Sequence, residues 1–184
     1  KPEPQLPEWV FFGLSQLQHR GQERAGIAYS DGNQLWIEKG EGLVSHVLTD
    51  EKTKEIASHK PRMIIGQIRY STSKGTSSRH IQPQWLDTLS GRLALVHNGN
   101  IPELEEKKEQ LKKISEGQVD IADEANDTEF MLKKIFFLAT QNGGDMDKAI
   151  EKFMKTTNGS YSAALMTKHS VYLFRDPWGN RPLL

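Results

Sequence analysis

The strand-like segments of this chain are apolar on both faces, and this property most restricts the folds open to it. Residues 91–98 and 160–166 carry apolar side chains at consecutive as well as alternate positions. In the first segment, Leu93 and Leu95 lie on one face and Ala94 and Val96 on the other. In the second segment, one face holds Tyr161, Ala163 and Leu165, and the other holds Ala164 and Met166. Strands of this kind must be covered on both sides by other layers. We therefore expect a layered structure and not a sheet with one face in water.

The order of the predicted elements favours antiparallel sheets. The pattern predicts hairpins over residues 25–40 and 160–176, turning at Asp31-Gly32 and Lys168-His169, and strands over 62–71 and 91–98. The expected helices cover residues 8–21, 50–60, 102–115, 127–144 and 145–157. Because the helices do not alternate regularly with the strands, an α+β fold is indicated. A polar segment of about twenty residues joins the two single strands, and loops of that length are often functional.

Periodicity within the helices predicts which side chains face the core. The expected apolar stripes are Val10, Leu14 and Leu17 in the first helix; Leu104, Leu111 and Ile114 in residues 102–115; and Met146, Ala149, Ile150, Phe153 and Met154 in the last helix. Two ion pairs at i,i+4 spacing are expected on the exposed face of residues 102–115, Glu103–Lys107 and Glu109–Lys113.

Composition argues against several classes of function. The 184 residues contain 24 Lys and Arg and 24 Asp and Glu, so bulk charge does not favour nucleic acid or a membrane surface as a partner. No apolar run is long enough to span a membrane. Without cysteine there is neither a disulfide nor a thiolate metal site, and the six histidines show no ligand spacing, so no metal site is predicted. A cytoplasmic protein fits this composition.

Four polar clusters stand at the ends of predicted elements, and each has a structural interpretation. "QHRGQE" (18–23) suits a cationic last helical turn followed by Gly21. Arg69, in "IRYSTSKGTSS" (68–78), suits pairing with a structural carboxylate. Asn98-Gly99 in "HNGN" suits a tight hairpin turn, and Asp127 in "NDTE" suits a helix N-cap.

Three of these clusters also have a chemical interpretation. Arg69 could hold a carboxylate in a bidentate fork, and Asp127 could bind an ammonium group. The Asn98 amide and the Gly99 N–H could point toward one anion, with a tight bend at the strand end turning both. The segment after "HNGN" is a charged helix and not a returning strand, which weakens the simple hairpin interpretation.

Taken in order, the motifs resemble one family. "LQHRGQERAGI", "GLVSHV", "GQIRYSTSKG", "LALVHNGN", "NDTE", "GSYSAALM" and "RDPWGNRPL" are similar to the glutaminase domain of the glutamine phosphoribosylpyrophosphate amidotransferases, from about Gln16 to Leu184. The resemblance implies an N-terminal-nucleophile hydrolase fold, a four-layer α/β/β/α sandwich of two antiparallel sheets. It implies that residues 1–184 are one class II glutamine amidotransferase domain.

The resemblance also implies a reaction and a set of site residues. An N-terminal cysteine attacks the side-chain amide of glutamine, and the released ammonia passes to a phosphoribosyltransferase domain that makes 5-phosphoribosylamine for purine biosynthesis. The motif matches assign the oxyanion hole to Asn98 and Gly99, the glutamine α-carboxylate to Arg69 and Thr72, the α-ammonium to Asp127, and the nucleophile end of the pocket to Arg20 and Gly21.

The chain departs from the family in one important respect, because no residue is a cysteine. We expect the nucleophile to lie upstream of Lys1, in a chain that lacks its first strand and its phosphoribosyltransferase domain. The alternatives are a non-catalytic glutamine-binding or interaction module on the same scaffold, and another class II amidotransferase that forms glucosamine phosphate or asparagine. The expected partners are glutamine, the phosphoribosyltransferase domain and, for the full-length protein, further copies of itself. No cofactor is expected in this domain, and Mg²⁺ only with the phosphoribosyltransferase domain.

Overall fold

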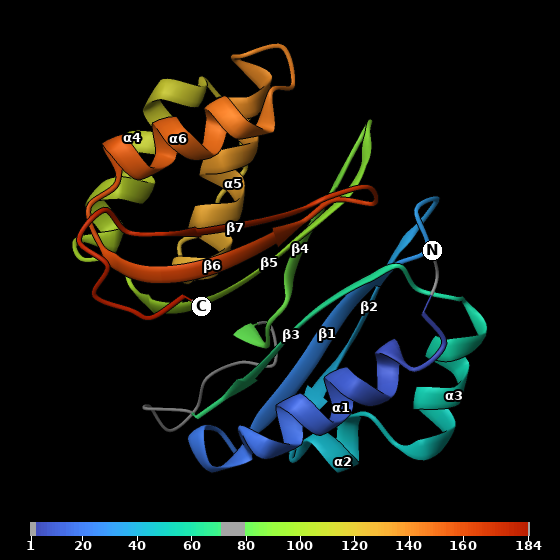
Figure 1. Cartoon of the computed structure of the whole chain (residues 1–184). Coiled ribbons are helices and arrows are strands. Elements are labelled where there is room, and N and C mark those ends of the chain that lie inside the picture. The colour runs from blue at the N-terminus through green and yellow to red at the C-terminus, as the bar shows by residue number, and fades with distance from the viewer. Residues whose placement is uncertain (1–2, 71–79, 184) are drawn as a thin grey trace. The chain divides into compact units, whose positions relative to one another are not determined.

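The structure is a computed structural model that describes residues 3–70 and 80–183 (Figure 1). Its contacts divide the chain into two compact units. The first contains residues 1–96 and 165–172, and the second contains residues 97–164 and 173–184. Both units combine strands with helices, and the predicted α+β class is confirmed.

The first unit is built on a three-stranded antiparallel sheet in the order β2-β1-β3. Its strands are β1 (Arg24–Ser30), β2 (Leu35–Glu41) and β3 (Met63–Arg69). The predicted hairpin at Asp31-Gly32 is confirmed, and the Asp31 carboxylate accepts the N–H groups of Asn33 and Gln34 at 2.7 and 2.9 Å. All seven residues of the central strand β1 are buried, as the two-sided covering requires.

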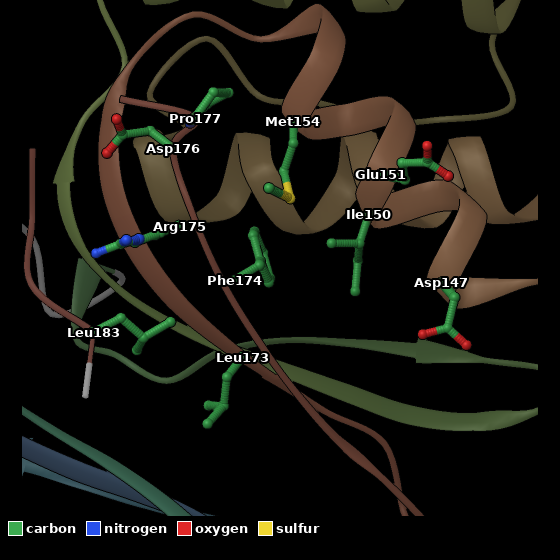
Figure 2. Close-up of a pocket in the computed structure, with 10 residues that line it drawn as sticks. All are labelled: Asp147, Ile150, Glu151, Met154, Leu173, Phe174, Arg175, Asp176, Pro177 and Leu183. Carbon is green, nitrogen blue, oxygen red and sulfur yellow. The ribbon is translucent and has the colours of Figure 1, made fainter. Parts of the chain in front are cut away.

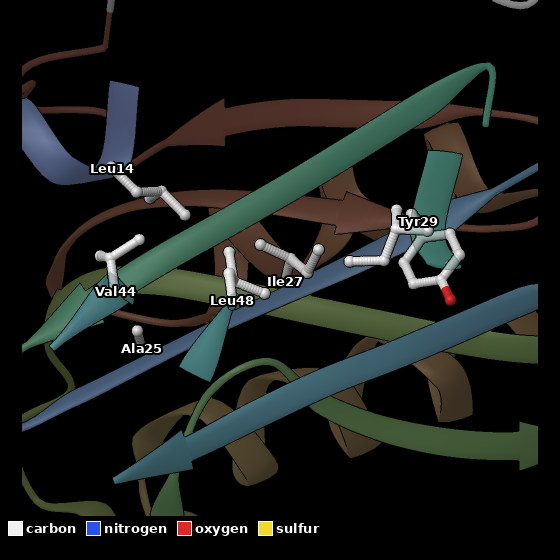
Figure 3. Packing of buried hydrophobic residues seen from close by; sticks show 7 residues of the cluster. Leu14, Ala25, Ile27, Tyr29, Val44 and Leu48 are labelled. Atoms are coloured by element: carbon white, nitrogen blue, oxygen red, sulfur yellow. The ribbon is translucent and has the colours of Figure 1, made fainter. Parts of the chain in front are cut away.

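Helices cover one face of this sheet. They are α1 (Leu6–Gln16), the short 3-10 helix η1 (Gln18–Arg20), α2 (Val44–Val47) and α3 (Asp50–Ser58). Helix α1 packs against β3, and α2 packs against β1 and β2. The buried side chains that fill this layer (Figure 3) are Leu14, Ala25, Ile27, Tyr29, Val44, Leu48 and Ile56.

The predicted stripe of the first helix is only partly right. Leu14 is buried and Val10 packs against the core, but Leu17 is 45% exposed. Helix α1 ends at Gln16, Leu17 is its C-cap, and the 3-10 helix η1 follows directly. The period of an α-helix therefore predicts burial within α1 but not at Leu17, the residue that follows it.

The second sheet has the strand order β4-β5-β6-β7. Its strands are β4 (Gln84–Thr88), β5 (Gly91–Asn100), β6 (Ser160–Met166) and β7 (Val171–Arg175). The predicted strand at 91–98 and the hairpin at 160–176 are confirmed. Strand β4, which pairs antiparallel with β5, was expected to be loop. Its five residues include Gln, Asp and Thr, and such a short polar edge strand carries little periodic signal.

Three helices complete the second unit: α4 (Leu104–Ser115), α5 (Asp127–Thr140) and α6 (Met146–Thr156). The predicted amphipathic helix α6 is confirmed, because Ala149, Ile150 and Phe153 are buried. The Phe153 ring lies 5.6 Å from that of Tyr161 on β6 and 6.2 Å from that of Phe174 on β7. Aromatic packing therefore holds α6 on the sheet.

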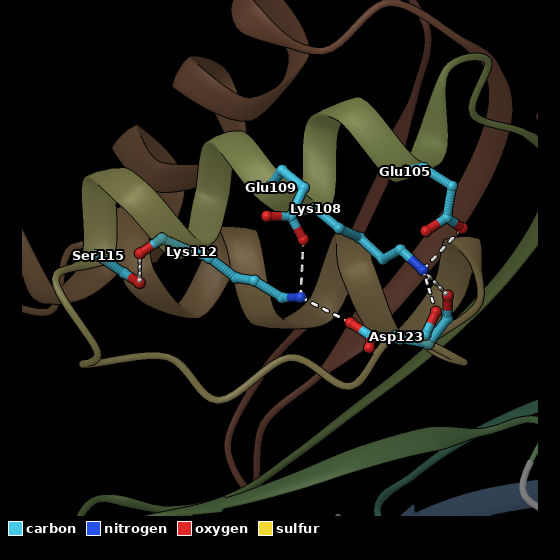
Figure 4. A network of polar contacts seen from close by, with 7 residues as sticks. Glu105, Lys108, Glu109, Lys112, Ser115 and Asp123 are labelled. Carbon is cyan, nitrogen blue, oxygen red and sulfur yellow. Dashed lines mark hydrogen bonds and ion pairs between the residues drawn. The ribbon is translucent and has the colours of Figure 1, made fainter.

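Helix α4 buries a lysine that the predicted apolar stripe did not include. Leu111 is buried as predicted, but Ile114 is 57% exposed, whereas Lys108 is only 1% exposed. Figure 4 shows Lys108 Nζ directed at the Asp123 carbonyl, and it also contacts the Ala125 carbonyl at 3.5 Å and the Glu105 carboxylate at 2.8 Å. These acceptors offset the cost of burying the ammonium group.

One of the two predicted ion pairs on α4 forms. Lys107 contacts Glu103 at 3.1 Å, whereas Glu109 contacts Lys112 and not Lys113. Lys112 also contacts the Asp123 carboxylate at 2.7 Å (Figure 4). Lys112 therefore pairs both with Glu109, at i,i+3 spacing, and with the loop that follows α4.

Two buried tyrosines give a test of this packing. The Tyr29 hydroxyl contacts His59 Nδ1 at 3.1 Å, whereas the Tyr161 hydroxyl has no hydrogen-bond partner in the part of the chain that is described. Leaving a buried hydroxyl unsatisfied costs about 1–3 kcal/mol. We expect Tyr161→Phe to keep or raise the free energy of unfolding and Tyr29→Phe to lower it by about 1 kcal/mol. Urea unfolding measures both; equal losses would contradict the prediction.

We expect Lys134 on α5 to make the free energy of unfolding rise with pH. Its Nζ lies 5.8 Å from the ring centres of Phe130 and Phe153 and 2.8 Å from Thr157 Oγ1. Burial, helped by the charge of Lys107, lowers the pKa of Lys134 from 10.5 to about 8. Between these values the folded chain binds fewer protons than the unfolded chain, so folding gains stability as pH rises through that window.

The test compares urea unfolding at several values of pH. Relative to Lys134→Met, the wild-type chain should become more stable as pH rises above about 8. The exposed Lys152 on α6 provides the control, because Lys152→Met should keep the wild-type dependence. Parallel curves for the wild type and Lys134→Met would show that the prediction is wrong.

Candidate active site

Gly21 and Arg69 come together in the first unit. Gly21 follows η1, and Arg69 is the last residue of β3. A Cβ atom on Gly21 would lie 2.7–3.0 Å from the backbone C, N and Cα atoms of Arg69. Gly21 has an extended φ of −173°, so it does not end the helix in the left-handed conformation that the sequence suggested. Glycine is required here because another backbone passes so close.

The Arg69 guanidinium is held by the backbone. Its Nη1 donates to the His80 carbonyl at 3.1 Å. A guanidinium presents several N–H donors in a planar fork that matches a carboxylate. Arg20 is exposed at the end of η1, and the predicted site residue Thr72 lies outside the described residues.

In the second unit, Asn98 and Gly99 lie within strand β5 and not in a turn. The strand continues to Asn100, so the predicted tight bend is wrong. Gly99 has a φ of +150°, and a Cβ atom there would lie 1.9 Å from the Ser160 carbonyl oxygen and 2.7 Å from Tyr161 Cα. Glycine lets the strand stay extended while β6 passes at this distance. The Asn98 side chain is exposed.

The sequence suggested Asp127 as the N-cap of α5, but Asp127 does not occupy that position. That position belongs to Asn126, whose side-chain oxygen accepts the Glu129 N–H at 2.9 Å. Asp127 is the first helical residue, and its Oδ2 accepts the Ile101 N–H at 2.9 Å. The carboxylate thus links the segment after β5 to the start of α5, where the helix dipole favours a negative charge.

A second contact joins strand β5 itself to the start of α5. His97 Nδ1 lies 2.8 Å from Thr128 Oγ1, and both side chains are buried. His97 precedes Asn98 in the chain, and Thr128 follows Asp127. Sequence reasoning passed over this pair, although both are polar residues adjacent to predicted site residues. The strand that carries Asn98 is therefore tied to the helix that begins at Asp127.

A pocket of about 540 Å³ lies elsewhere in the second unit, between α6 and β7 (Figure 2). Its lining residues are Asp147, Ile150, Glu151, Met154, Leu173, Phe174, Arg175, Asp176, Pro177 and Leu183. None of these is a predicted site residue. Within residues 3–70 and 80–183, His, Asp and Glu side chains form no group that could hold a metal ion, and no helix is long and apolar enough to cross a membrane.

Comparison with known proteins decides the family. The family profile described as a glutamine amidotransferase domain matches residues 67–184. The chain belongs to the glutamine amidotransferase family. The amidophosphoribosyltransferase of Mus musculus is 33% identical to this glutamine amidotransferase domain over 97% of the chain, and that of Bacillus subtilis is 34% identical over 97%. These matches cover 34% and 36% of the two relatives, so the chain spans about a third of their length.

Solved structures agree with this assignment. The structure of the allosteric regulatory enzyme of purine biosynthesis matches the glutamine amidotransferase domain with a TM-score of 0.82 and 32% identity, over 98% of this chain and 37% of that one. The glutamine phosphoribosylpyrophosphate amidotransferase from B. subtilis, complexed with ADP and GMP, matches with a TM-score of 0.78 and 32% identity, over 96% and 36%. The family resemblance that the motifs indicated is therefore confirmed. The fold that this resemblance implied is confirmed as well.

The close approach at Gly99 predicts an unusually large effect of one methyl group. Gly117 also has a positive φ, +82°, but a Cβ atom there would meet nothing within 4 Å. Gly117→Ala should therefore lower the free energy of unfolding by about 1 kcal/mol, from backbone strain alone. Gly99→Ala should lower the free energy of unfolding by at least about 3 kcal/mol, because the added Cβ overlaps a backbone carbonyl. Urea unfolding compares the two; similar losses would contradict the close approach.

Proposed function

We propose that this domain hydrolyses glutamine to glutamate and ammonia. The ammonia then serves a phosphoribosyltransferase domain of the same protein, which converts phosphoribosylpyrophosphate into 5-phosphoribosylamine in purine biosynthesis. The observation that carries the proposal is the similarity to amidophosphoribosyltransferases over 97% of this chain. The close packing at Gly21 and Gly99, both within the matching motifs, gives it further support.

The proposed roles divide glutamine into its charged end and its reacting amide. Arg69 and Thr72 bind the α-carboxylate, and Asp127 binds the α-ammonium. A carboxylate has two oxygens with several acceptor positions, so the contact of Asp127 with the Ile101 N–H is compatible with this role. Fixing both charged groups would leave the amide in one place, which is the positioning that catalysis needs.

At the amide, the Asn98 side chain and the Gly99 N–H stabilise the negative oxygen of the tetrahedral intermediate. Removing one such donor typically lowers the rate by about 10²–10³. Arg20 and Gly21 line the nucleophile end of the pocket. The reaction requires a thiol that attacks the amide carbon, releases ammonia and leaves a thioester for water to cleave. Because the 184 residues contain no cysteine, the proposal places that thiol outside them.

Glutamine binding tests the residue assignments without requiring turnover. Arg69→Met and Asp127→Asn should each raise the dissociation constant for glutamine about 10- to 100-fold, because each removes a hydrogen bond to a charged group. Asp147→Asn is the control, because Asp147 lines the separate pocket between α6 and β7. Isothermal titration calorimetry on the full-length protein measures all three. Equal affinities for the wild type and both site variants would refute the assignments.

Ammonia release by the full-length protein separates the remaining alternatives. Glutamine-dependent ammonia release, with a Cys-Gly start upstream of Lys1 in the gene, is the expected result. Glutamine binding without release, and without such a cysteine, would establish the non-catalytic binding module. A sugar-isomerase or ATP-binding domain after Leu184 would replace the purine assignment with another class II amidotransferase.

A further inference from the structure

Lys39 is directed at backbone oxygens and not at a carboxylate. It lies on β2, and its Nζ donates to the Ile81 carbonyl at 2.7 Å and to the Pro83 carbonyl at 3.0 Å. The Gln84 side chain adds a third contact, from its Nε2 to the Ile81 carbonyl at 3.0 Å. The Ile81–Pro83 segment is thus held by two side chains although it belongs to no helix or strand.

The same segment lies directly on the backbone of the central strand. Gly26 of β1 stands opposite Lys39 in the sheet. A Cβ atom on Gly26 would lie 2.2 Å from the Gln82 carbonyl oxygen, 2.7 Å from Lys39 Cβ and 3.0 Å from Pro83 Cδ. The absence of a side chain at Gly26 therefore lets Ile81–Pro83 settle on the sheet, and Lys39 holds it there.

Holding an ammonium group in this place has a cost. Ile81, Gln82 and Pro83 are all buried, and burial lowers the pKa of Lys39 below its usual value. An apolar side chain could cover the sheet without this cost, but it could not donate hydrogen bonds to two carbonyls. The position of the segment is what the lysine contributes.

The held segment leads to Arg69. His80 immediately precedes it, and the His80 carbonyl accepts the hydrogen bond from Arg69 Nη1 at 3.1 Å. The carbonyls of His80 and Ile81 belong to adjacent peptide units, so fixing one restricts the other. A continuous path of contacts therefore runs from Lys39 through the segment to the guanidinium of Arg69.

We propose that Lys39 is a positioning residue for Arg69. By holding Ile81–Pro83 against β1, it sets the place of the His80 carbonyl and hence the direction of the Arg69 fork. The inference rests on the proposed function, in which Arg69 binds the α-carboxylate of glutamine. Bidentate binding depends on direction, and a misplacement of about 1 Å can cost about 10²-fold. Lys39 itself would not touch the substrate.

The first test replaces the ammonium group and keeps the aliphatic stem. In the full-length protein, Lys39→Met should raise the KM for glutamine about tenfold and leave kcat within about twofold, because it weakens binding of a group remote from the reacting amide. Lys39→Arg keeps a donor and should restore most of the affinity. Lys54→Met, at an exposed position of α3, is the matched control and should behave as the wild type.

The second test displaces the segment from the opposite side. Gly26→Ala would push the Gln82 carbonyl away from β1 and crowd the Lys39 Cβ, so it should raise KM in the same way although the ammonium group of Lys39 is kept. Thermal unfolding of every variant and calorimetric titration with glutamine accompany the kinetics. A lower melting temperature with an unchanged glutamine affinity in both Lys39→Met and Gly26→Ala would overturn the inference, because Lys39 would then only support the fold.

Arg69→Met distinguishes failure of the inference from failure of the proposed function. If Arg69→Met weakens glutamine binding and Lys39→Met does not, only the positioning role is lost. If Arg69→Met leaves glutamine binding unchanged, the proposed role of Arg69 and the inference built on it both fail. Parallel weakening in Arg69→Met, Lys39→Met and Gly26→Ala, with rescue by Lys39→Arg, is the expected outcome.

Discussion

The first unit depends on the burial of strand β1 from both sides. On one face Ala25, Ile27 and Tyr29 pack against the helices (Figure 3). On the other face the Ile81–Pro83 segment lies on Gly26, and the Ser30 hydroxyl donates to the Lys168 carbonyl at 2.7 Å. Burial of apolar surface drives the first face. The second face is covered by backbone, so there the fit depends on small side chains and on donors for carbonyl oxygens.

Lysines supply donors to irregular segments in both units. Lys39 holds the segment after His80, while Lys108 and Lys112 hold Asp123 in the loop that leads to Asp127 (Figure 4). A loop that lies against the body of a protein needs partners for its carbonyl groups, because water cannot reach all of them. A lysine carries its donors on a long stem and can reach them from a neighbouring strand or helix. The irregular segments beside Arg69 and Asp127 are both held in this way.

The sequence was sufficient to predict most of the elements and not sufficient to predict their ends. Segments with a strong apolar pattern, such as the run in β6 and the amphipathic face of α6, formed where the pattern placed them. Strand β4 was missed because its pairing with β5, and not its own composition, makes it a strand. The cap of α5 was assigned to the wrong neighbour because Asn126 and Asp127 are both good capping residues. The contact of Asp127 with the Ile101 N–H, which comes from a distant part of the chain, accounts for its other role.

The candidate site could also be predicted only in part from the sequence. The order of the motifs was enough to single out Arg69, Asn98 and Asp127, because their types and spacing match a family. The reason for glycine at positions 21 and 99 could not be predicted, since it depends on backbones that approach from elsewhere in the chain. Lys39 and His97 were not singled out at all, because their partners are backbone carbonyls or a distant hydroxyl.

The close approaches at glycine have a consequence for redesign of the domain. At Gly21 and Gly99 the nearest neighbour is the backbone of a strand, which cannot move aside as the end of a side chain could. A library that seeks a new substrate by varying the whole "HNGN" or "HRGQ" motif would therefore contain mostly unfolded members. Diversity is better placed at Asn98 and Arg20, whose exposed side chains can change without moving a strand. The glycines define the shape of the scaffold, and their exposed neighbours are the positions at which its chemistry can be altered.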